Sequence, residues 1–453
     1  MSYSISTTQL GESGPFSTAS IEGSGTDEGL GLRVASNKDG TIMAITSANT
    51  NSTEAGFVQV YQYASGTDSW SPMGAAIGGA PSDANLGYNL ALNHSGDKLV
   101  IGAPRINSLA GEAKIYDWAG TGWDYNTGFE GNGVSNPYVG QSVAINGSGN
   151  RVAIGSKTKI NVYDEDSGWA VVGSTITPSA HPDDGGVVNI QSLALNAAGD
   201  RFAYGNILYN TSRGRVQIYD YNGSSWSVET TFDGGSNDAI GYQIRLNNSG
   251  DIITFGGHRN INQYAHDGAS WAANGSTIEP SASADADDFG KKGLGVSDDG
   301  TVLLVGIPGA DVGSNERGYF SIYKFDNSTW NAAGIPNFIF TQLNGRFGEG
   351  LAINESGTVI GIGAPTSPEF GSEGAFVAFS LAISEPPFQT SGPLSLSGVR
   401  AYIIDQGGSV GSDNYSISGL YQAASDAGIT LSGSAPYPGV EDARSLSGFY
   451  GMT

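Results

Sequence analysis

The residues that most often carry catalysis or metal binding are scarce in this chain and lie far apart. Cysteine is absent, and the four histidines, His94, His181, His258 and His266, lack the spacing of metal ligands. No G-x-S-x-G elbow, P-loop or dinucleotide-binding glycine pattern stands where a strand meets a helix. We therefore expect no metal, no cofactor and no thiol or serine nucleophile.

Carboxylates are the one type of catalytic group in good supply. The chain has 44 Asp and Glu against 20 Lys and Arg, which gives a net charge of −24. A pair of carboxyl groups suffices to cleave a glycosidic bond, and acidic clusters stand at Asp183 and Asp184 and at Asp285, Asp287 and Asp288. Solvated loop acids are the simpler interpretation. The same charge disfavours binding to nucleic acid or anionic membrane, and no apolar run is long enough to span a membrane.

A repeat positions these groups along most of the chain. Each copy has a first strand that ends in Asn, a turn closed by Gly, a continuous apolar strand and an alternating third strand. Asn and Gly at these places are typical of tight hairpin turns. The Asn becomes Ser297 in the sixth copy only. The turn glycines, 50 to 57 residues apart, are Gly40, Gly96, Gly149, Gly199, Gly250, Gly300 and Gly357.

Six of the seven tryptophans open a fourth strand at the same place in six copies. A ring of aromatic side chains that stacks on sugars is one interpretation. A residue present in nearly every module usually serves the module, so we interpret these side chains as packing against the neighbouring copy. They are Trp70, Trp123, Trp169, Trp226, Trp271 and Trp330.

Four antiparallel strands per copy and seven copies predict an all-β fold, a seven-bladed β-propeller over residues 1–386. The copies begin near residues 30, 86, 139, 189, 240, 289 and 347. The seventh copy has no Trp strand, so we expect residues 1–29, which contain YSISTTQL, to supply the closing strand of that blade. Residues 387–453 are expected to form a small C-terminal module.

One face of such a propeller should carry the variable loops. The loop between strands two and three and the connection to the next blade leave an antiparallel blade on the same side, and variable loops on a rigid scaffold commonly bind ligands. These loops have a modest excess of cationic residues, which predicts a face that binds anionic polysaccharide; chance placement of the cations is the alternative. Asp83, Asp184 and Asp238 in the connections between blades would cancel part of the positive electrostatic field. The candidate ligand-binding residues are Arg105, Lys157, Lys159, Arg213, Arg215, His258, Arg259 and Arg317.

Several copies resemble the FG-GAP repeats of integrin α-subunit propellers. The resemblance lies in Phe289-Gly290, Phe347-Gly348 and the IGAP runs at Ile101 and Ile362, and it covers about residues 30–386. It implies the same propeller fold. Those repeats often carry an Asp-rich calcium loop. Here that loop reads NHSGDK or SDDGTV, so we expect Asp298 and Asp299 to be solvated turn acids.

The C-terminal segment resembles a short module of virion and tail proteins of double-stranded DNA phages. Its segments GPLSLSGVRAYI and RSLSGFYG carry the likeness, with Gly398 and Gly448 in place of an acidic residue. A third Ser-apolar-Ser-Gly motif spans 416–419. The resemblance implies that residues 387–453 attach the chain to other virion proteins.

These patterns predict a non-enzymatic structural protein of a phage virion, a tail, fibre or appendage component present in several copies that recognises a host-surface glycan. The N-terminal residues lack a basic start followed by an apolar run, so we expect no secretory signal, synthesis in the host cytoplasm and location in the virion. The alternatives are a capsid decoration protein, a polysaccharide depolymerase on a virion or secreted by a bacterium, and a bacterial surface adhesin.

Overall fold

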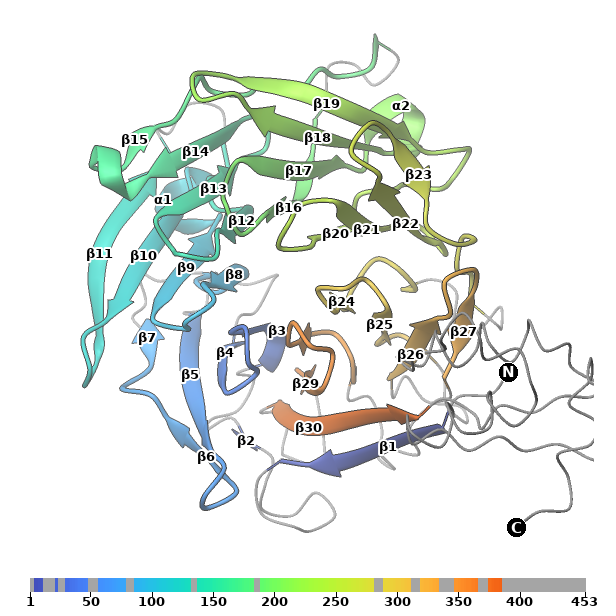
Figure 1. Ribbon diagram of the computed structural model, residues 1–453. Coiled ribbons are helices and arrows are strands. Elements are labelled where there is room, and N and C mark those ends of the chain that lie inside the picture. Colours follow the sequence, from blue (N-terminus) through green and yellow to red (C-terminus); the bar gives the residue numbers. More distant parts are fainter. Residues whose placement is uncertain are drawn as a thin grey trace, which may run out of the picture. The chain divides into compact units, whose positions relative to one another are not determined.

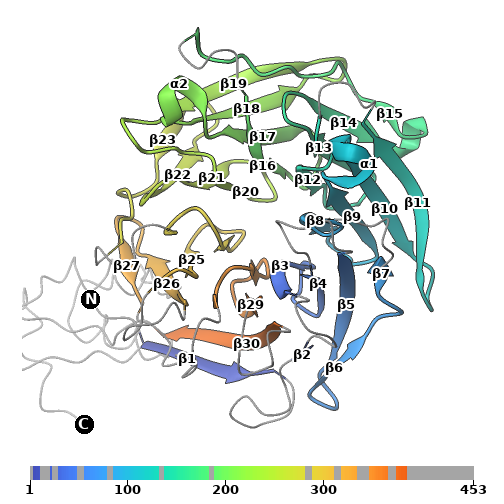
Figure 2. The same ribbon diagram turned by 180° about the vertical axis from the view of Figure 1, so that it is seen from behind.

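Seven antiparallel sheets stand around a central axis in the computed structural model (Figure 1), and Figure 2 shows the same ring from behind. The predicted all-β, seven-bladed propeller is therefore confirmed. The structure describes residues 4–10, 21–22, 29–47, 56–78, 85–131, 137–182, 188–280, 288–310, 318–333, 346–365 and 374–384. Among them, no helix is long and apolar enough to cross a membrane.

The strands follow the order of the sequence from blade to blade. Blade 1 has β3 (Leu30–Ser36), β4 (Ile42–Ser47), β5 (Phe57–Ala64), β6 (Ser69–Pro72) and β7 (Ile77–Gly78); blade 2 has β8 (Asn89–Leu92), β9 (Lys98–Ala103), β10 (Glu112–Trp118) and β11 (Trp123–Glu130). Blade 3 has β12 (Ser142–Ile145), β13 (Arg151–Gly155), β14 (Ile160–Asp164) and β15 (Ala170–Val171); blade 4 has β16 (Ile190–Leu195), β17 (Arg201–Asn206), β18 (Arg215–Tyr221) and β19 (Trp226–Asp233). Blade 5 has β20 (Gln243–Leu246), β21 (Ile252–Gly256), β22 (Ile261–His266) and β23 (Trp271–Ala273); blade 6 has β24 (Leu294–Val296), β25 (Val302–Ile307), β26 (Tyr319–Phe325) and β27 (Trp330–Ala332). Blade 7 has β28 (Leu351–Ile353), β29 (Val359–Ala364), β30 (Ala375–Ser384), β1 (Ser4–Gln9) and β2 (Ile21–Glu22). The helical segments are α1 (Ile106–Leu109), α2 (Tyr209–Ser212) and a 3₁₀ turn at Glu165–Ser167.

The propeller belongs to one compact unit, Ile5–Ile383. The second unit, Met1–Ser4 with Ser384–Thr453, lies almost entirely outside the described residues. The expected C-terminal module at 387–453 lies wholly outside them, with its three Ser-apolar-Ser-Gly motifs.

Both ends of the propeller segment meet in blade 7. The N-terminal strand β1 lies beside β30, on the edge away from β29, as the expectation of a closing strand requires. After β1, the short β2 pairs with the start of β30, and in blade 1 the short β7 pairs with the start of β5 in the same way. The N-terminal segment thus repeats, in blade 7, the path of an ordinary fourth strand.

The burial of the strands follows their sequence patterns. Every residue of β4 and β25 is buried, because these second strands are covered by blades on both faces. In β5, buried positions alternate with more exposed ones, as its alternating sequence predicts. The cores consequently lie between blades: one cluster joins Val58 of blade 1 to Leu99 of blade 2.

The turn between the first and second strands is closed by the repeated Asn. In blade 4 the Asn196 Oδ1 atom accepts from the backbone N–H groups of Asp200 and Arg201, at 3.1 and 3.0 Å. In blade 6 the Ser297 hydroxyl accepts from the Val302 N–H instead, at 2.9 Å. All seven repeat glycines have a positive φ, between 68 and 83°, a conformation that glycine adopts without steric cost.

The residue after each turn Asn joins its blade to the next, and the seven junctions form a closed ring. Six are backbone N–H to carbonyl bonds of 2.8 to 3.1 Å. At the seventh, the Asn248 N–H donates to the Asp298 Oδ1 atom at 2.7 Å. The members in order are Lys38, His94, Gly147, Ala197, Asn248, Asp298 and Glu355, and Glu355 donates back to Lys38.

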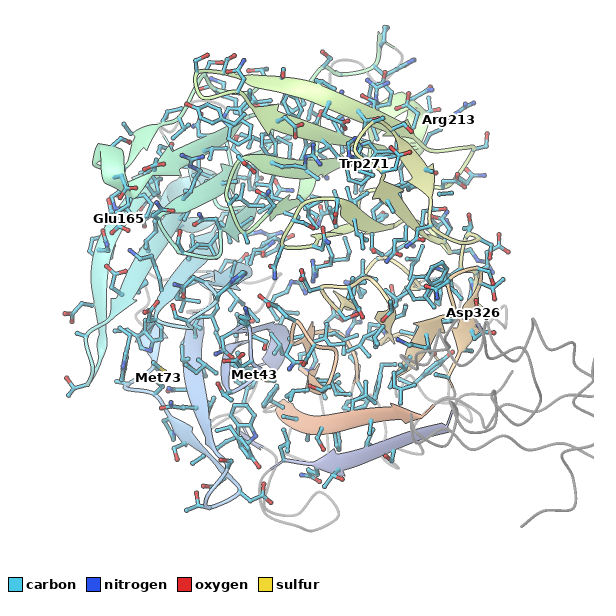
Figure 3. The ribbon with its side chains drawn as sticks, in the orientation of Figure 1. Met43, Met73, Glu165, Arg213, Trp271 and Asp326 are labelled. Atoms are coloured by element: carbon cyan, nitrogen blue, oxygen red, sulfur yellow. The ribbon has the colours of Figure 1, made fainter. Side chains whose placement is uncertain are left out.

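The six repeated tryptophans lie between blades. The Nε1 atoms of Trp123, Trp226 and Trp330 donate to backbone carbonyls of the preceding blade, at 2.9 to 3.2 Å. Those of Trp169 and Trp271 donate to side chains of the preceding blade, and Trp70 packs edge-on against a ring of blade 7; Figure 3 labels Trp271. The tryptophans therefore act as contacts between blades.

Pairs of glycines let neighbouring backbones approach closely at five of the blade junctions. A Cβ added to Gly363 of β29 would overlap the Gly31 carbonyl oxygen of blade 1. The equivalent pairs are Gly102 with Gly140, Gly205 with Gly241, Gly256 with Gly290, and Gly306 with Gly348. A side chain at any of these positions would clash with the neighbouring backbone, which explains why glycine recurs in the second strand and before the first strand of the next blade.

Candidate binding face of the propeller

The loops between the second and third strands of blades 2 and 4 have an unusual backbone. Both loops contain a left-handed turn of three residues other than glycine, with φ between 53 and 73°: Asn107, Ser108 and Leu109 in one, and Asn210, Thr211 and Ser212 in the other. Such residues cost about 1 kcal/mol or more each and persist only where the surroundings hold them. In blade 2 the carbonyls of Leu109 and Ala110 accept from the N–H groups of Tyr138 and Val139. The loop of blade 2 therefore positions the entry to blade 3.

A pocket of about 310 Å³ opens on this face between blades 2, 3 and 4. It combines two phenol rings, two cationic side chains and two side-chain amides with a small apolar wall. Its lining residues are Tyr88, Pro104, Arg105, Tyr138, Gln141, Lys157, Val188, Asn189 and Leu208. Both cationic side chains, Arg105 and Lys157, are exposed.

Contacts within the wall hold these groups in place. The Lys157 ammonium lies 5.9 Å from the centre of the Tyr138 ring, and the Lys157 N–H donates to the Pro137 carbonyl at 2.8 Å. The Gln141 Nε2 atom donates to the Asn189 Oδ1 atom at 2.7 Å, across the junction of blades 3 and 4. The pocket therefore presents a cation and an aromatic face as one unit, next to a fixed pair of amides.

Tyr138 occupies a backbone position that favours other residues. Its φ is 55°, and the residue at the same place in the repeat also has a positive φ in blades 1, 2, 5 and 7, as Gly29, Asn85, Ala239 and Arg346. Glycine and asparagine adopt this conformation readily, whereas tyrosine does not. The unfavourable backbone is retained at Tyr138 together with a ring that lines the pocket.

The other predicted ligand-binding residues lie elsewhere on the same set of loops. Lys159, Arg213 and Arg259 are exposed and His258 is half-buried, and none of the four lines the pocket. Figure 3 shows Arg213 at the outer rim beside α2. Arg317 lies outside the described residues. The structure thus brings two of the eight candidates, Arg105 and Lys157, into one pocket.

The Arg215 guanidinium is already paired with other side chains of the protein. Its guanidinium donates to both carboxylate oxygens of Asp233, at 2.6 and 2.7 Å, and lies 3.6 Å from the centre of the Tyr209 ring. The hydrogen bonds with Asp233 raise the pKa of Arg215 above its usual value. Its charge is compensated, which reduces its attraction for an external anion.

The structure describes only some of the acidic candidates, and Asp298 and Asp299 among them are engaged by neighbouring protein groups. Asp183, Asp184, Asp285 and Asp287 lie outside the described residues. The Asp299 carboxylate accepts from Ser297 and Thr301 within its own turn, and Asp298 is part of the ring of blade junctions. Within the described part of the chain, no group of three or more His, Cys, Asp or Glu could hold a metal ion.

The tyrosines and amides of the pocket were not among the binding residues predicted from the sequence. Tyr88 and Gln141 both stand five positions before the turn Asn of their repeat, at the start of the inner strand. An alignment of the repeats on that Asn places Gln191 and Tyr242 at the same position. This alignment marks the position in the repeat from which Tyr88 and Gln141 line the pocket.

Comparison with known protein families finds no match, and comparison with curated proteins finds none either. Among solved structures, the chain is similar to the β-propeller domain of Cps50 (Swd1) from Myceliophteria thermophila, with a TM-score of 0.53 and 12% identity over 80% of this chain and 98% of that one. It is also similar to a putative 6-phosphogluconolactonase from Bacteroides uniformis, with a TM-score of 0.50 and 13% identity over 71% of this chain and 89% of that one. At such identities the likeness establishes the β-propeller fold alone.

Proposed function

We propose that this chain is a non-enzymatic structural protein of a phage virion, in a tail, fibre or appendage, that binds a host-surface glycan with the variable face of its propeller. The pocket between blades 2, 3 and 4 is the observation that carries glycan binding. The virion assignment rests on the likeness of the C-terminal Ser-apolar-Ser-Gly motifs to the phage module.

The chemistry of the pocket suits an acidic saccharide. Tyr88 and Tyr138 offer broad, partly apolar rings to the faces of sugars, and the amides of Gln141 and Asn189 can exchange hydrogen bonds with hydroxyl groups. Arg105 and Lys157 supply the positive charge that a uronic or sialic acid carboxylate would require. The net charge of −24 repels any polyanion at long range, the proposed acidic glycan included, so binding and selectivity both rest on the local contacts of the pocket.

The C-terminal residues 387–453 are proposed to attach the propeller to other virion proteins. This arrangement leaves the variable face free to meet the host surface. Deletion of residues 388–453 should leave a folded, soluble propeller that no longer enters particles, and its normal incorporation would refute this attachment role. Mass spectrometry of purified particles tests location directly, because absence of the chain from them would exclude a virion protein.

Binding to purified host polysaccharide tests the pocket. Tyr138→Asn removes the ring but installs the residue that blade 2 holds at the same backbone position, so folding should be preserved while affinity falls about tenfold, the equivalent of about 1.4 kcal/mol. Lys157→Gln should have a similar effect. Arg213→Gln is the matched control, because Arg213 is exposed and does not line the pocket.

If all three variants bind the polysaccharide with the affinity of the wild-type protein, recognition lies elsewhere on the molecule. Release of new reducing ends from the polysaccharide would show a glycan-degrading enzyme and contradict the non-enzymatic proposal.

A further inference from the structure

The inner strands that surround the central axis contain two charged residues, and both are arginines. The seven strands are β3, β8, β12, β16, β20, β24 and β28. Arg33 belongs to β3 in blade 1 and Arg245 to β20 in blade 5, and both line a central cavity of about 280 Å³. The remaining lining is largely Ala, Leu, Val and Ile.

Arg245 departs from the rule that the repeat follows at its position. Two residues before the turn Asn, or its Ser equivalent, the other six copies have a small side chain, and blade 5 alone has a long cationic one. The small residues are Ala35, Ala91, Ala144, Ala194, Gly295 and Ala352. Packing of the blades therefore does not require an arginine there.

The Arg245 guanidinium has no carboxylate partner among the described residues. Its Nη1 atom donates to the neighbouring Ile244 carbonyl at 2.8 Å. Burial, and to a smaller extent the charge of Arg33, lowers the pKa of Arg245 to about 10. Arg245 is half-buried, and the positive charge of Arg33 acts on it, so it lacks the compensation that charges removed from water usually have.

Arg33 shares its carboxylate with two stronger partners. Its Nη1 atom lies 4.0 Å from Glu349, whereas Lys292 and Arg346 approach that carboxylate to 3.0 and 2.5 Å. Burial alone would raise the pKa of Glu349, but Lys292, Arg346 and Arg33 together hold it below its usual value. Three cations therefore meet one carboxylate, and Arg245 adds a further positive charge that acts on Arg33, in a protein whose net charge is −24.

We infer that the central cavity binds a small doubly charged oxyanion, of the sulfate or phosphate type, between the guanidinium groups of Arg33 and Arg245. Guanidinium donors match the oxygen edges of such anions in bidentate geometry. Two negative charges on the anion offset the repulsion between the arginines. Neither Arg33 nor Arg245 lines the glycan pocket, so the failure of either proposal leaves the other intact.

Thermal unfolding of the full chain in sulfate or phosphate, against sodium chloride of equal ionic strength, tests this site. The wild-type protein should show a saturable stabilisation, with the unfolding constant reduced about 100-fold at 100 times the Kd. Arg245→Ala, which installs the commonest residue of the other blades, and Arg33→Gln should abolish the saturable part. Arg213→Ala, an exposed arginine outside the cavity, should retain it.

The two anions are separate arms of the test, and a saturable response to either one supports the site. An equal response of the wild-type protein and Arg245→Ala, or a response no greater than that to chloride, would overturn it. Crystals of the wild-type protein grown with selenate give a readout that needs no variant. An anomalous peak between Arg33 and Arg245 is expected, and a cavity without one would contradict the inference.

Discussion

The contact between blade 7 and blade 1 allows a sharp test of how the ring is closed. Gly363→Ala adds a single methyl group where β29 meets the backbone of Gly31. Besides overlapping the Gly31 carbonyl oxygen, the new Cβ would lie 2.6 and 2.7 Å from the carbonyl carbon and the Cα of Gly31, closer than the 3.0 Å below which real Cβ contacts essentially never occur. All three atoms belong to the backbone, so no side-chain rotation can relieve the clash.

The expected loss in the free energy of unfolding is about 3 kcal/mol. Overpacking of a core usually costs about 1 to 3 kcal/mol, and a rigid backbone obstacle places this variant at the upper end. Gly31 cannot move freely, because it has a φ of 98° and lies beside the Leu30 to Gly374 bridge between the two blades. The blades must therefore separate locally.

Urea unfolding monitored by tryptophan fluorescence measures this loss. Gly66→Ala is the matched control, because a Cβ there would meet no atom within 4 Å and the position has no positive φ; its effect should stay within about 0.5 kcal/mol. If Gly363→Ala costs no more than Gly66→Ala, close backbone approach is not what the repeated glycines provide.

Three further predictions concern two residues of the repeat and the Glu349 carboxylate beside Arg33. Trp226→Phe removes a buried donor and leaves the Val172 carbonyl without it, so urea unfolding should show a loss of about 1 to 3 kcal/mol. Asn196→Ala removes the acceptor of two backbone N–H groups and should cost about 1 to 2 kcal/mol in the same assay, with Asn196→Ser, the residue that blade 6 has at this position, retaining part of the stability. Because the pKa of Glu349 is lowered, its contribution to stability is fully present above the ordinary value of 4.5 and is lost as the pH falls through the lowered pKa. Glu349→Gln should therefore flatten the acid side of a stability profile measured between pH 3 and 7.

The architecture was predictable because each blade repeats the same local chemistry. The turn Asn, or Ser297 in one copy, and the turn Gly specify a hairpin in all seven copies, and the Trp at the start of the fourth strand marks six of the seven blade junctions, so the spacing establishes the number of blades. The steric partner of a glycine such as Gly363 was not predictable, because Gly31 lies more than 300 residues away in the sequence.

The candidate site was predictable only in part, because a pocket depends on which loops meet. Arg105 and Lys157 were identified as cations in variable loops, but their neighbour Tyr138 enters through a left-handed backbone that local sequence preferences disfavour. Arg245 carries a detectable signal, a long side chain where the other copies have Ala or Gly, yet its meaning requires knowing that the inner strands enclose a cavity.

The propeller ring is closed in two separate ways, and the ring of blade junctions formed by Lys38, His94 and the five equivalent residues is the inner one. It works as a hoop around the central axis, and none of its seven members belongs to β1 or β30, the first and last strands of the propeller. The pairing of β1 with β30 works as a latch at the outer edge of blade 7. The pairing of β1 with β30 can therefore break without breaking the ring of junctions. A force applied to the N-terminal strand would act on the outer edge of blade 7, while the seven junction hydrogen bonds still hold the inner strands in register. New chain ends placed in another outer connection would leave the same hoop intact, which makes this propeller a candidate for circular permutation.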